Sequence, residues 1–173
     1  MKTYGTTKGT GTAVQDVRIV HPFAPVYDGN SRILILGTMP SPVSRENGFY
    51  YGHGQNRFWP VLAAIFSEPI PETVEQKRAL VLRHGIALWD VLYSCRISGA
   101  NDASIKEPVA NDLRILPHIR RIYTTGKTAW KLYNDLCFPF TNIPAVCLPS
   151  TSAANRGRWP LEKLIEAYKV IAK

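Results

Sequence analysis

Short apolar runs alternate along the chain with segments whose apolar residues follow helical spacing. The apolar runs predict four buried strands, over Arg32–Gly37, Ile86–Val91, Arg121–Gly126 and Ile143–Leu148. The helical spacing predicts helices over Asn56–Phe66, Pro71–Arg83, Lys127–Leu136 and Trp159–Ala172. Strands that alternate with helices are typical of an α/β fold with a mainly parallel sheet. In such sheets ligands bind beyond the carboxyl ends of the strands, so the loops that follow the strands are the candidate site.

Length and composition limit the possible classes of protein. A chain of 173 residues with 45% hydrophobic residues can bury the core of one ordinary domain, which we predict over residues 14–173. The Thr-, Gly- and Lys-rich residues 1–13 are interpreted as a flexible tail. No apolar run reaches about 18 residues and no apolar leader is visible, so we expect no membrane partner and a cytoplasmic location, nucleoid-associated in a bacterium or archaeon.

The charge balance favours a polyanionic partner without identifying it. The chain has 21 Lys and Arg against 13 Asp and Glu, which gives a net charge of +8. Three cysteines without a CxxC pattern and four scattered histidines predict no metal site, and no cofactor is expected. The absence of GxSxG, P-loop and GxGxxG motifs disfavours hydrolases with a nucleophile elbow and nucleotide-binding folds.

Two loops after predicted strands hold most of the candidate chemistry. Residues 37–59 combine small residues, aromatic residues, a histidine and an amide, and residues 148–159 offer hydroxyls, an amide and two arginines. We expect both loops to meet at one edge of the sheet, where the first supplies an aromatic platform and the second supplies groups suited to a phosphate backbone.

Ordinary structural roles are open for the same residues. Aromatic residues dominate protein cores, and an Asn or Ser before a helix is often its N-cap. These alternatives apply to Phe49, Tyr50, Tyr51, His53, Asn56 and Ser150–Ser152, and Phe58 and Trp59 are expected in the core.

The two loops together resemble the uracil-DNA glycosylase superfamily, and within it the hypoxanthine-DNA glycosylase (DNA-deoxyinosine glycosylase) family. The resemblance covers about residues 18–172 and rests on the segments LILGTMPS, YYGHGQNRFW, ALWDVL, TTGKTAWKLY and LPSTSAAN. It implies a three-layer α/β/α sandwich around a four-stranded parallel sheet. It also implies a monofunctional, metal-independent enzyme that flips a deaminated base out of DNA and hydrolyses its N-glycosidic bond in base excision repair. The expected partner is damaged double-stranded DNA, single strands are left open, and a monomer is expected.

The resemblance assigns roles in the first loop. Tyr51 takes the position of the aromatic residue that stacks on the base, and Asn56 takes that of the catalytic amide. Gly37 and Ser41 are predicted to complete the base pocket. Met39 stands where mismatch-specific uracil glycosylases have the Asn that positions the water. Backbone groups around Thr38 and Met39, or the side chains of Ser41 or Ser44, are therefore left as candidates for holding the water.

The second loop also departs from uracil-cleaving relatives. Leu148 replaces their His or Asn and offers no donor to a base carbonyl. Hypoxanthine is therefore predicted as the preferred base with uracil second, because one Asn side chain can donate to O6 or N7 and accept from N1–H. The predicted DNA-binding residues are Ser150, Thr151, Ser152, Asn155, Arg156, Arg158 and Lys127.

Three hypotheses follow from the sequence. The first is a DNA glycosylase for deaminated bases, with a uracil/thymine mismatch-specific enzyme as its alternative. The second is a catalytically weak DNA-binding member of the same fold, which a base-release assay distinguishes from the first. The third is an unrelated small-molecule hydrolase, for which the sequence supplies no recognisable nucleophile and base.

Overall fold

A computed structural model describes residues 16–173, and the predicted tail at residues 1–13 lies outside them. A parallel four-stranded sheet in the order β3-β2-β6-β7 forms the centre of the molecule. Its strands are β2 (Ile33–Gly37), β3 (Ile86–Asp90), β6 (Arg121–Thr125) and β7 (Ala145–Leu148). These are the four predicted strands. Every residue of β2 and β3 is buried, as expected for parallel strands covered on both faces.

All four predicted helices are present. They are α2 (Phe58–Ile65), α3 (Val74–Arg83), α4 (Lys127–Leu136) and α6 (Leu161–Tyr168), which continues as the 3₁₀ turn η4 (Lys169–Ala172). Three of them, α2, α3 and α6, begin later than the spacing suggested. α3 begins after Thr73 because Thr73 and Gln76 form a capping box. The short helices α1 (Pro42–Asn47) and α5 (Phe138–Thr141) were not predicted. Phe58 and Trp59 are buried in the core as expected.

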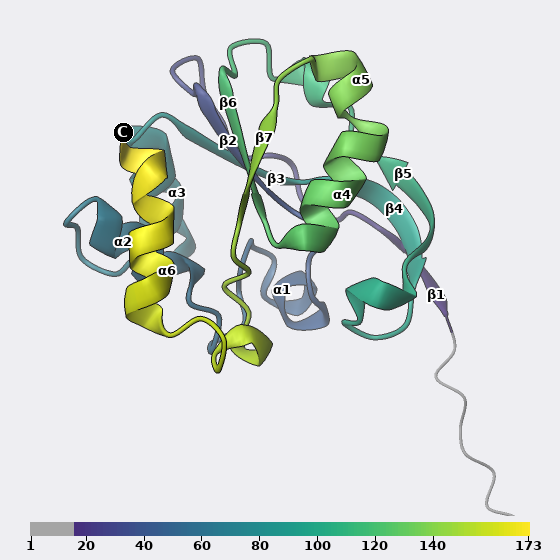
Figure 1. The fold of residues 1–173 in the computed structure, drawn as a ribbon, viewed down its shortest axis with the longest axis horizontal. Coiled ribbons are helices and arrows are strands. Elements are labelled where there is room, and N and C mark those ends of the chain that lie inside the picture. The colour runs from purple at the N-terminus through teal and green to yellow at the C-terminus, as the bar shows by residue number, and fades with distance from the viewer. Residues whose placement is uncertain (1–15) are drawn as a thin grey trace, which may run out of the picture.

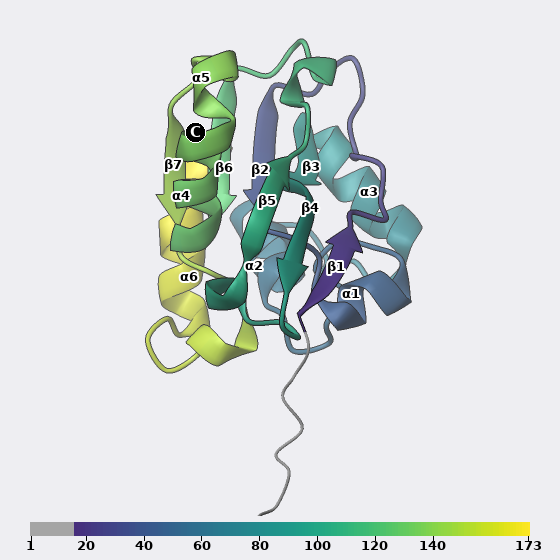
Figure 2. The same ribbon diagram turned by 90° about the vertical axis from the view of Figure 1, so that its right-hand side faces the viewer.

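The two faces of the parallel sheet have different covers (Figures 1 and 2). Helices α2, α3 and α6 cover one face, and α4 covers part of the other. The rest of that second face is covered by an antiparallel sheet in the order β1-β4-β5, whose strands are β1 (Val17–Val20), β4 (Leu92–Ile97) and β5 (Lys106–Ala110). The resemblance implied helices on both faces, which α4 provides on this face, and the antiparallel sheet beside α4 was not predicted.

The missed sheet has a local physical cause. β3 and β4 are separated by Val91 alone, so the apolar run that predicts one strand belongs to two sheets. β4 then alternates buried and exposed positions, with Tyr93 and Arg96 outward, as an antiparallel strand covered on one face does. The 3₁₀ turn η1 (Asp102–Ser104) lies in the β4–β5 hairpin.

The carboxyl ends of the parallel strands lie at one edge of the molecule, at the bottom of Figure 1. The loop with α1, the loop after β7 and its 3₁₀ turn η3 (Ala153–Asn155) gather at this edge. No helix in the described part of the chain is long and apolar enough to cross a membrane.

Candidate active site

A broad cavity of about 1120 Å³ opens at the carboxyl ends of the strands. Both candidate loops line it, and Asp90 at the end of β3 and residues 100–103 of the β4–β5 hairpin add to its wall. The cavity brings together most of the predicted site residues, which are Gly37, Thr38, Met39, Ser41, Tyr51, Asn56, Lys127, Ser150, Ser152, Asn155 and Arg158.

Arg57 joins the two loops. Its backbone N–H donates to the carbonyl of Thr151 (3.1 Å), and its guanidinium donates to the carbonyls of Ser152 (3.0 Å) and Trp159. Arg57 is buried, and the loss of hydration lowers the pKa of its guanidinium. The buried Arg57 therefore holds the two loops together through its hydrogen bonds to the carbonyls of the second loop.

The Asn56 side chain is held in one orientation by two donors. Its Oδ1 accepts from the backbone N–H of Phe58 (2.9 Å) and from the hydroxyl of Thr151 (2.8 Å). Because a backbone N–H can only donate, the atom that faces Phe58 must be the oxygen of the amide. The Nδ2 group has no hydrogen-bond partner among the described residues, and Asn56 lines the cavity. Asn56 is thus both a helix-start residue and a positioned donor.

The three consecutive aromatic residues of the first loop have different roles. Phe49 and Tyr50 are buried, and the Tyr50 hydroxyl donates to the carbonyl of Ala24 (2.9 Å). Tyr51 lines the cavity at intermediate exposure, and one face of its ring stacks on Phe58 with centroids 3.8 Å apart and an interplanar angle of 12°. Phe58 therefore covers one face of the Tyr51 ring.

The backbone of Tyr51 is strained at this position. Its φ of 52° lies in the left-handed region, which costs free energy for a residue with a large side chain. The Tyr51 hydroxyl is 3.2 Å from the Thr125 hydroxyl, and burial together with the nearby Asp90 raises the pKa of Tyr51, so the phenol stays neutral. Stacking and this hydroxyl contact hold the ring in its place.

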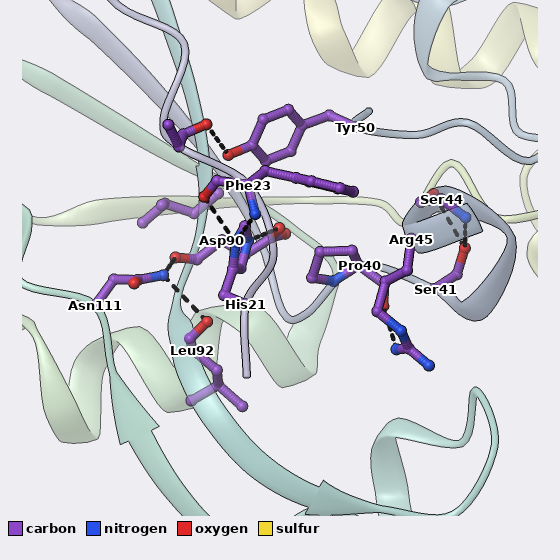
Figure 3. A network of polar contacts seen from close by, with 12 residues as sticks. His21, Phe23, Pro40, Ser41, Ser44, Arg45, Tyr50, Asp90, Leu92 and Asn111 are labelled. Atoms are coloured by element: carbon purple, nitrogen blue, oxygen red, sulfur yellow. Dashed lines mark hydrogen bonds and ion pairs between the residues drawn. The ribbon is translucent and has the colours of Figure 1, made fainter. Parts of the chain in front are cut away.

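A buried pair lies behind the cavity (Figure 3). His21 Nε2 is 2.7 Å from Asp90 Oδ2, and Asn111 Nδ2 donates to the backbone carbonyls of Asp90 (2.9 Å) and Leu92 (3.1 Å). A Cβ on Gly37 would lie 2.3 Å from Asp90 Oδ1, so only glycine fits beside this carboxylate. The sequence did not predict the role of His21. A single histidine does not indicate whether it is buried in a pair, as His21 is, or exposed, as His53 is.

The hydroxyls considered as holders of water serve the first loop itself. The Ser41 hydroxyl accepts from the backbone N–H of Ser44 (3.2 Å) and donates to the Ser44 hydroxyl (3.0 Å). The Ser44 hydroxyl also accepts from the N–H of Gly52 (3.0 Å). The backbone carbonyl of Thr38 accepts from the N–H of Leu92 (3.1 Å). Met39 packs against the edge of the core, with no hydrogen-bonding group for a water on its side chain.

The second loop differs from the prediction at two positions. Thr151 is 2% exposed and its hydroxyl is bonded to Asn56, so it positions Asn56 instead of reaching a phosphate. Arg156 is exposed but does not line the cavity. Asn155 Nδ2 donates to the carbonyl of Ser150 (2.9 Å), which holds the loop closed on itself. Lys127 and Arg158 are exposed at the cavity.

Asp102 is a site residue that sequence reasoning left among ordinary turn residues. It lines the cavity from η1, and the Thr38 hydroxyl of the first loop stabilises its charged form. Within residues 16–173, no group of three His, Cys, Asp or Glu side chains is arranged to hold a metal ion.

The sequence matches a known protein family. The model of the uracil DNA glycosylase superfamily matches residues 24–170. The chain belongs to this superfamily. The family resemblance, the predicted α/β fold with its parallel four-stranded sheet and the enzyme class, a DNA glycosylase, are thereby confirmed.

Relatives from two archaea are similar over most of the chain. Proteins named hypoxanthine DNA glycosylase from Methanosarcina barkeri and Methanosarcina acetivorans are 38% and 34% identical over 139 residues, which cover 78% of this chain and 87% of each relative. The solution NMR structure of a candidate uracil DNA glycosylase from Methanosarcina acetivorans has a TM-score of 0.74 and 28% identity. That similarity covers 91% of this chain and all of the other.

Proposed function

We propose that this member of the uracil DNA glycosylase superfamily excises hypoxanthine from damaged DNA by hydrolysis of the N-glycosidic bond. The observation that carries the proposal is the open Nδ2 donor of Asn56 in the same cavity as Tyr51, whose ring is held by stacking on Phe58. A flipped base that stacks on Tyr51 offers its edge to donors in this cavity. The relatives named hypoxanthine DNA glycosylase support this choice of base.

Asn56 acts on the leaving base. When the bond to the sugar breaks, the base departs with the electron pair and negative charge builds on its ring and carbonyl. The Asn56 NH₂ group, fixed in advance by Phe58 and Thr151, donates to O6 or N7 and stabilises this charge. Its oxygen is occupied by two donors, so Asn56 supplies donors alone, and the sequence-based idea that it also accepts from N1–H is abandoned.

The pocket favours hypoxanthine over uracil at Leu148. This side chain is buried and lines the cavity, and the family resemblance places it where uracil-cleaving glycosylases carry a His or Asn. A uracil carbonyl that faces Leu148 would lose its hydrogen bond with water without gaining another, which is unfavourable. Uracil is therefore the secondary substrate in this proposal. We also propose that the enzyme works as a cytoplasmic monomer.

Base release from matched duplexes tests the proposal. Duplexes that carry a single hypoxanthine, uracil, xanthine or mismatched thymine are incubated with the protein, and alkaline cleavage of the abasic strand measures excision. We expect the fastest release for hypoxanthine, slower release for uracil and none for an adenine control. No release from any of the duplexes would contradict the glycosylase proposal, and a uracil rate above the hypoxanthine rate would contradict the base preference.

Tyr51→Ala is expected to lower kcat/KM for hypoxanthine excision by roughly tenfold to a hundredfold, because base–aromatic stacking contributes about 1–3 kcal/mol. Tyr51→Phe keeps the ring on Phe58 and loses only the hydroxyl contact with Thr125, so it should stay close to the wild-type rate. Single-turnover rates at several enzyme concentrations measure both variants. Equal losses in the two would show that the hydroxyl matters more than the ring.

Lys127→Ala and Arg158→Ala are each expected to weaken binding to any duplex and to reduce the slope of log K against log salt by about one. Both cations are exposed at the cavity, and neither forms a salt bridge with a described residue. Arg114→Ala is the matched control, since that arginine is paired with Asp112 and lies outside the cavity. Fluorescence anisotropy at several salt concentrations gives the slopes, and an unchanged slope would exclude the residue from the phosphate contacts.

A further inference from the structure

We propose that Asp102 is a catalytic residue of this site and accepts a proton from the water that attacks the sugar. The inference rests on the proposed glycosylase function and supplies the group that the first loop lacks. Of the other candidate side chains on the wall, Ser41 and Ser44 bond within the loop. The Asp90 side chain is 7% exposed, bonds His21 through Oδ2 and packs Oδ1 beside Gly37.

The β4–β5 hairpin presents Asp102 on an ordered turn. The Asn101 side chain accepts from the backbone N–H of Ala103 (3.1 Å) and caps η1. The Ser104 hydroxyl donates to the carbonyl of Asn101 (2.7 Å) and accepts from the N–H of Ser98 (2.9 Å). These bonds fix the turn through residues other than Asp102, whose carboxyl is left for the cavity.

Hydrogen bonding also joins strand β4 of the hairpin to the first loop. The N–H of Leu92 in β4 donates to the carbonyl of Thr38 (3.1 Å), and the Thr38 hydroxyl stabilises the Asp102 carboxylate. Thr38 directly precedes Met39, which lines the cavity without a hydrogen-bonding group for a water on its side chain. A carboxylate from the hairpin therefore reaches the wall where an attacking water is needed.

The electrostatic setting suits a general base. Asp102 is exposed as a residue, but the protein around the cavity removes part of its hydration and, with the negative Asp90 nearby, raises the pKa of its carboxyl. A carboxylate whose pKa lies closer to neutral accepts a proton more effectively. A negative charge in a cavity that must accommodate DNA also repels phosphates, so its presence there is better explained by chemistry than by binding.

The reaction balances in one turnover. The bond between C1′ and the base nitrogen breaks, and the electron pair leaves with the base beside Asn56. The water oxygen forms the new bond to C1′ while one of its protons passes to the Asp102 carboxylate. The departed base then takes up a proton from solvent, and Asp102 loses its proton to solvent. The products are the free base and an abasic site.

Asp102→Asn is the decisive variant, measured in single turnover on the hypoxanthine duplex together with its affinity for that duplex. We expect a rate roughly 100-fold lower, in the range typical for a lost general base, with equal or tighter DNA binding because a charge that repels phosphates is removed. Asp102→Ser is assayed beside it, and thermal unfolding confirms that both variants fold. Asp135→Asn, which removes a carboxylate outside the cavity, should stay close to wild type.

The pH dependence separates chemistry from a structural role. The groups that act on the pKa of Asp102 are Asp90 from β3 and the Thr38 hydroxyl. The charges of Asp102, Arg45 of α1 and Arg18 of β1 act on the nearby buried Cys95 of β4. The wild-type rate should fall as the pH decreases through the raised pKa of Asp102, and this fall should be absent in Asp102→Asn.

Each result decides between the two proposals. An Asp102→Asn rate within threefold of an active wild type, an equal loss in Asp135→Asn, or a pH profile that Asp102→Asn leaves unchanged would overturn the role of Asp102 and leave the glycosylase function intact. A wild-type protein that releases no base from any duplex would overturn both.

Discussion

Asn56→Asp should lower the rate of hypoxanthine excision by roughly 10²–10³-fold while leaving the fold nearly unchanged. The Asp side chain keeps an oxygen for the N–H of Phe58 and the hydroxyl of Thr151, but it replaces the Nδ2 donor by a second oxygen. An oxygen there repels the charge that builds on the leaving base. Loss of one such donor typically costs two to three orders of magnitude in rate.

Asn56→Ala separates the two roles of this residue. It should lose as much activity as Asn56→Asp and, in addition, about 1–2 kcal/mol of the free energy of unfolding, because the bond to the start of α2 is lost. Gln55→Ala is the matched control, since Gln55 is exposed beside Asn56 and lines the same cavity. Single-turnover rates and urea denaturation measure the two effects. If Asn56→Asp retained the wild-type rate, the oxygen would be the important atom and the assignment of the donor would be wrong.

The parallel sheet could be predicted because its strands are buried on both faces. Apolar runs such as Ile33–Leu36 admit few other interpretations when helical segments alternate with them. The antiparallel sheet could not be predicted in the same way. Its strands are short and partly polar, and β5 exposes most of its residues, so nothing in the local pattern distinguishes it from a loop.

The site residues whose roles the sequence could not predict were missed for a similar reason. The loops that meet at the sheet edge could be predicted because parallel strands bring their carboxyl ends together. The roles of Thr151 and Asp102 depend on the direction in which each side chain points. The sequence does not indicate this direction, and Thr151 is one of three consecutive hydroxyl residues. Thr151 was predicted to contact DNA and instead bonds Asn56, and Asp102 lies in a turn whose composition is that of an ordinary polar hairpin.

The His21–Asp90 pair shows how the second sheet supports the site. His21 follows β1, so the sheet that the sequence did not predict brings the imidazole to a carboxylate at the end of β3. The His21 side chain is 1% exposed and that of Asp90 is 7% exposed, so neither can exchange its partner for bulk water at low cost. Gly37 makes room for this carboxylate, because a Cβ there would lie 2.3 Å from Asp90 Oδ1.

His21→Ala should therefore lower the free energy of unfolding by about 3–5 kcal/mol, because it leaves a buried carboxylate without its partner. His53→Ala, an exposed histidine of the first loop, should change it by less than about 0.5 kcal/mol. Adding Asp90→Asn to His21→Ala should recover part of the loss, because an unpaired amide costs less to bury than an unpaired carboxylate. Urea denaturation of the two single variants and the double variant gives the coupling between the side chains. Equal losses from His21→Ala with and without Asp90→Asn would mean that the imidazole stabilises the protein by packing and that its bond to the carboxylate contributes nothing.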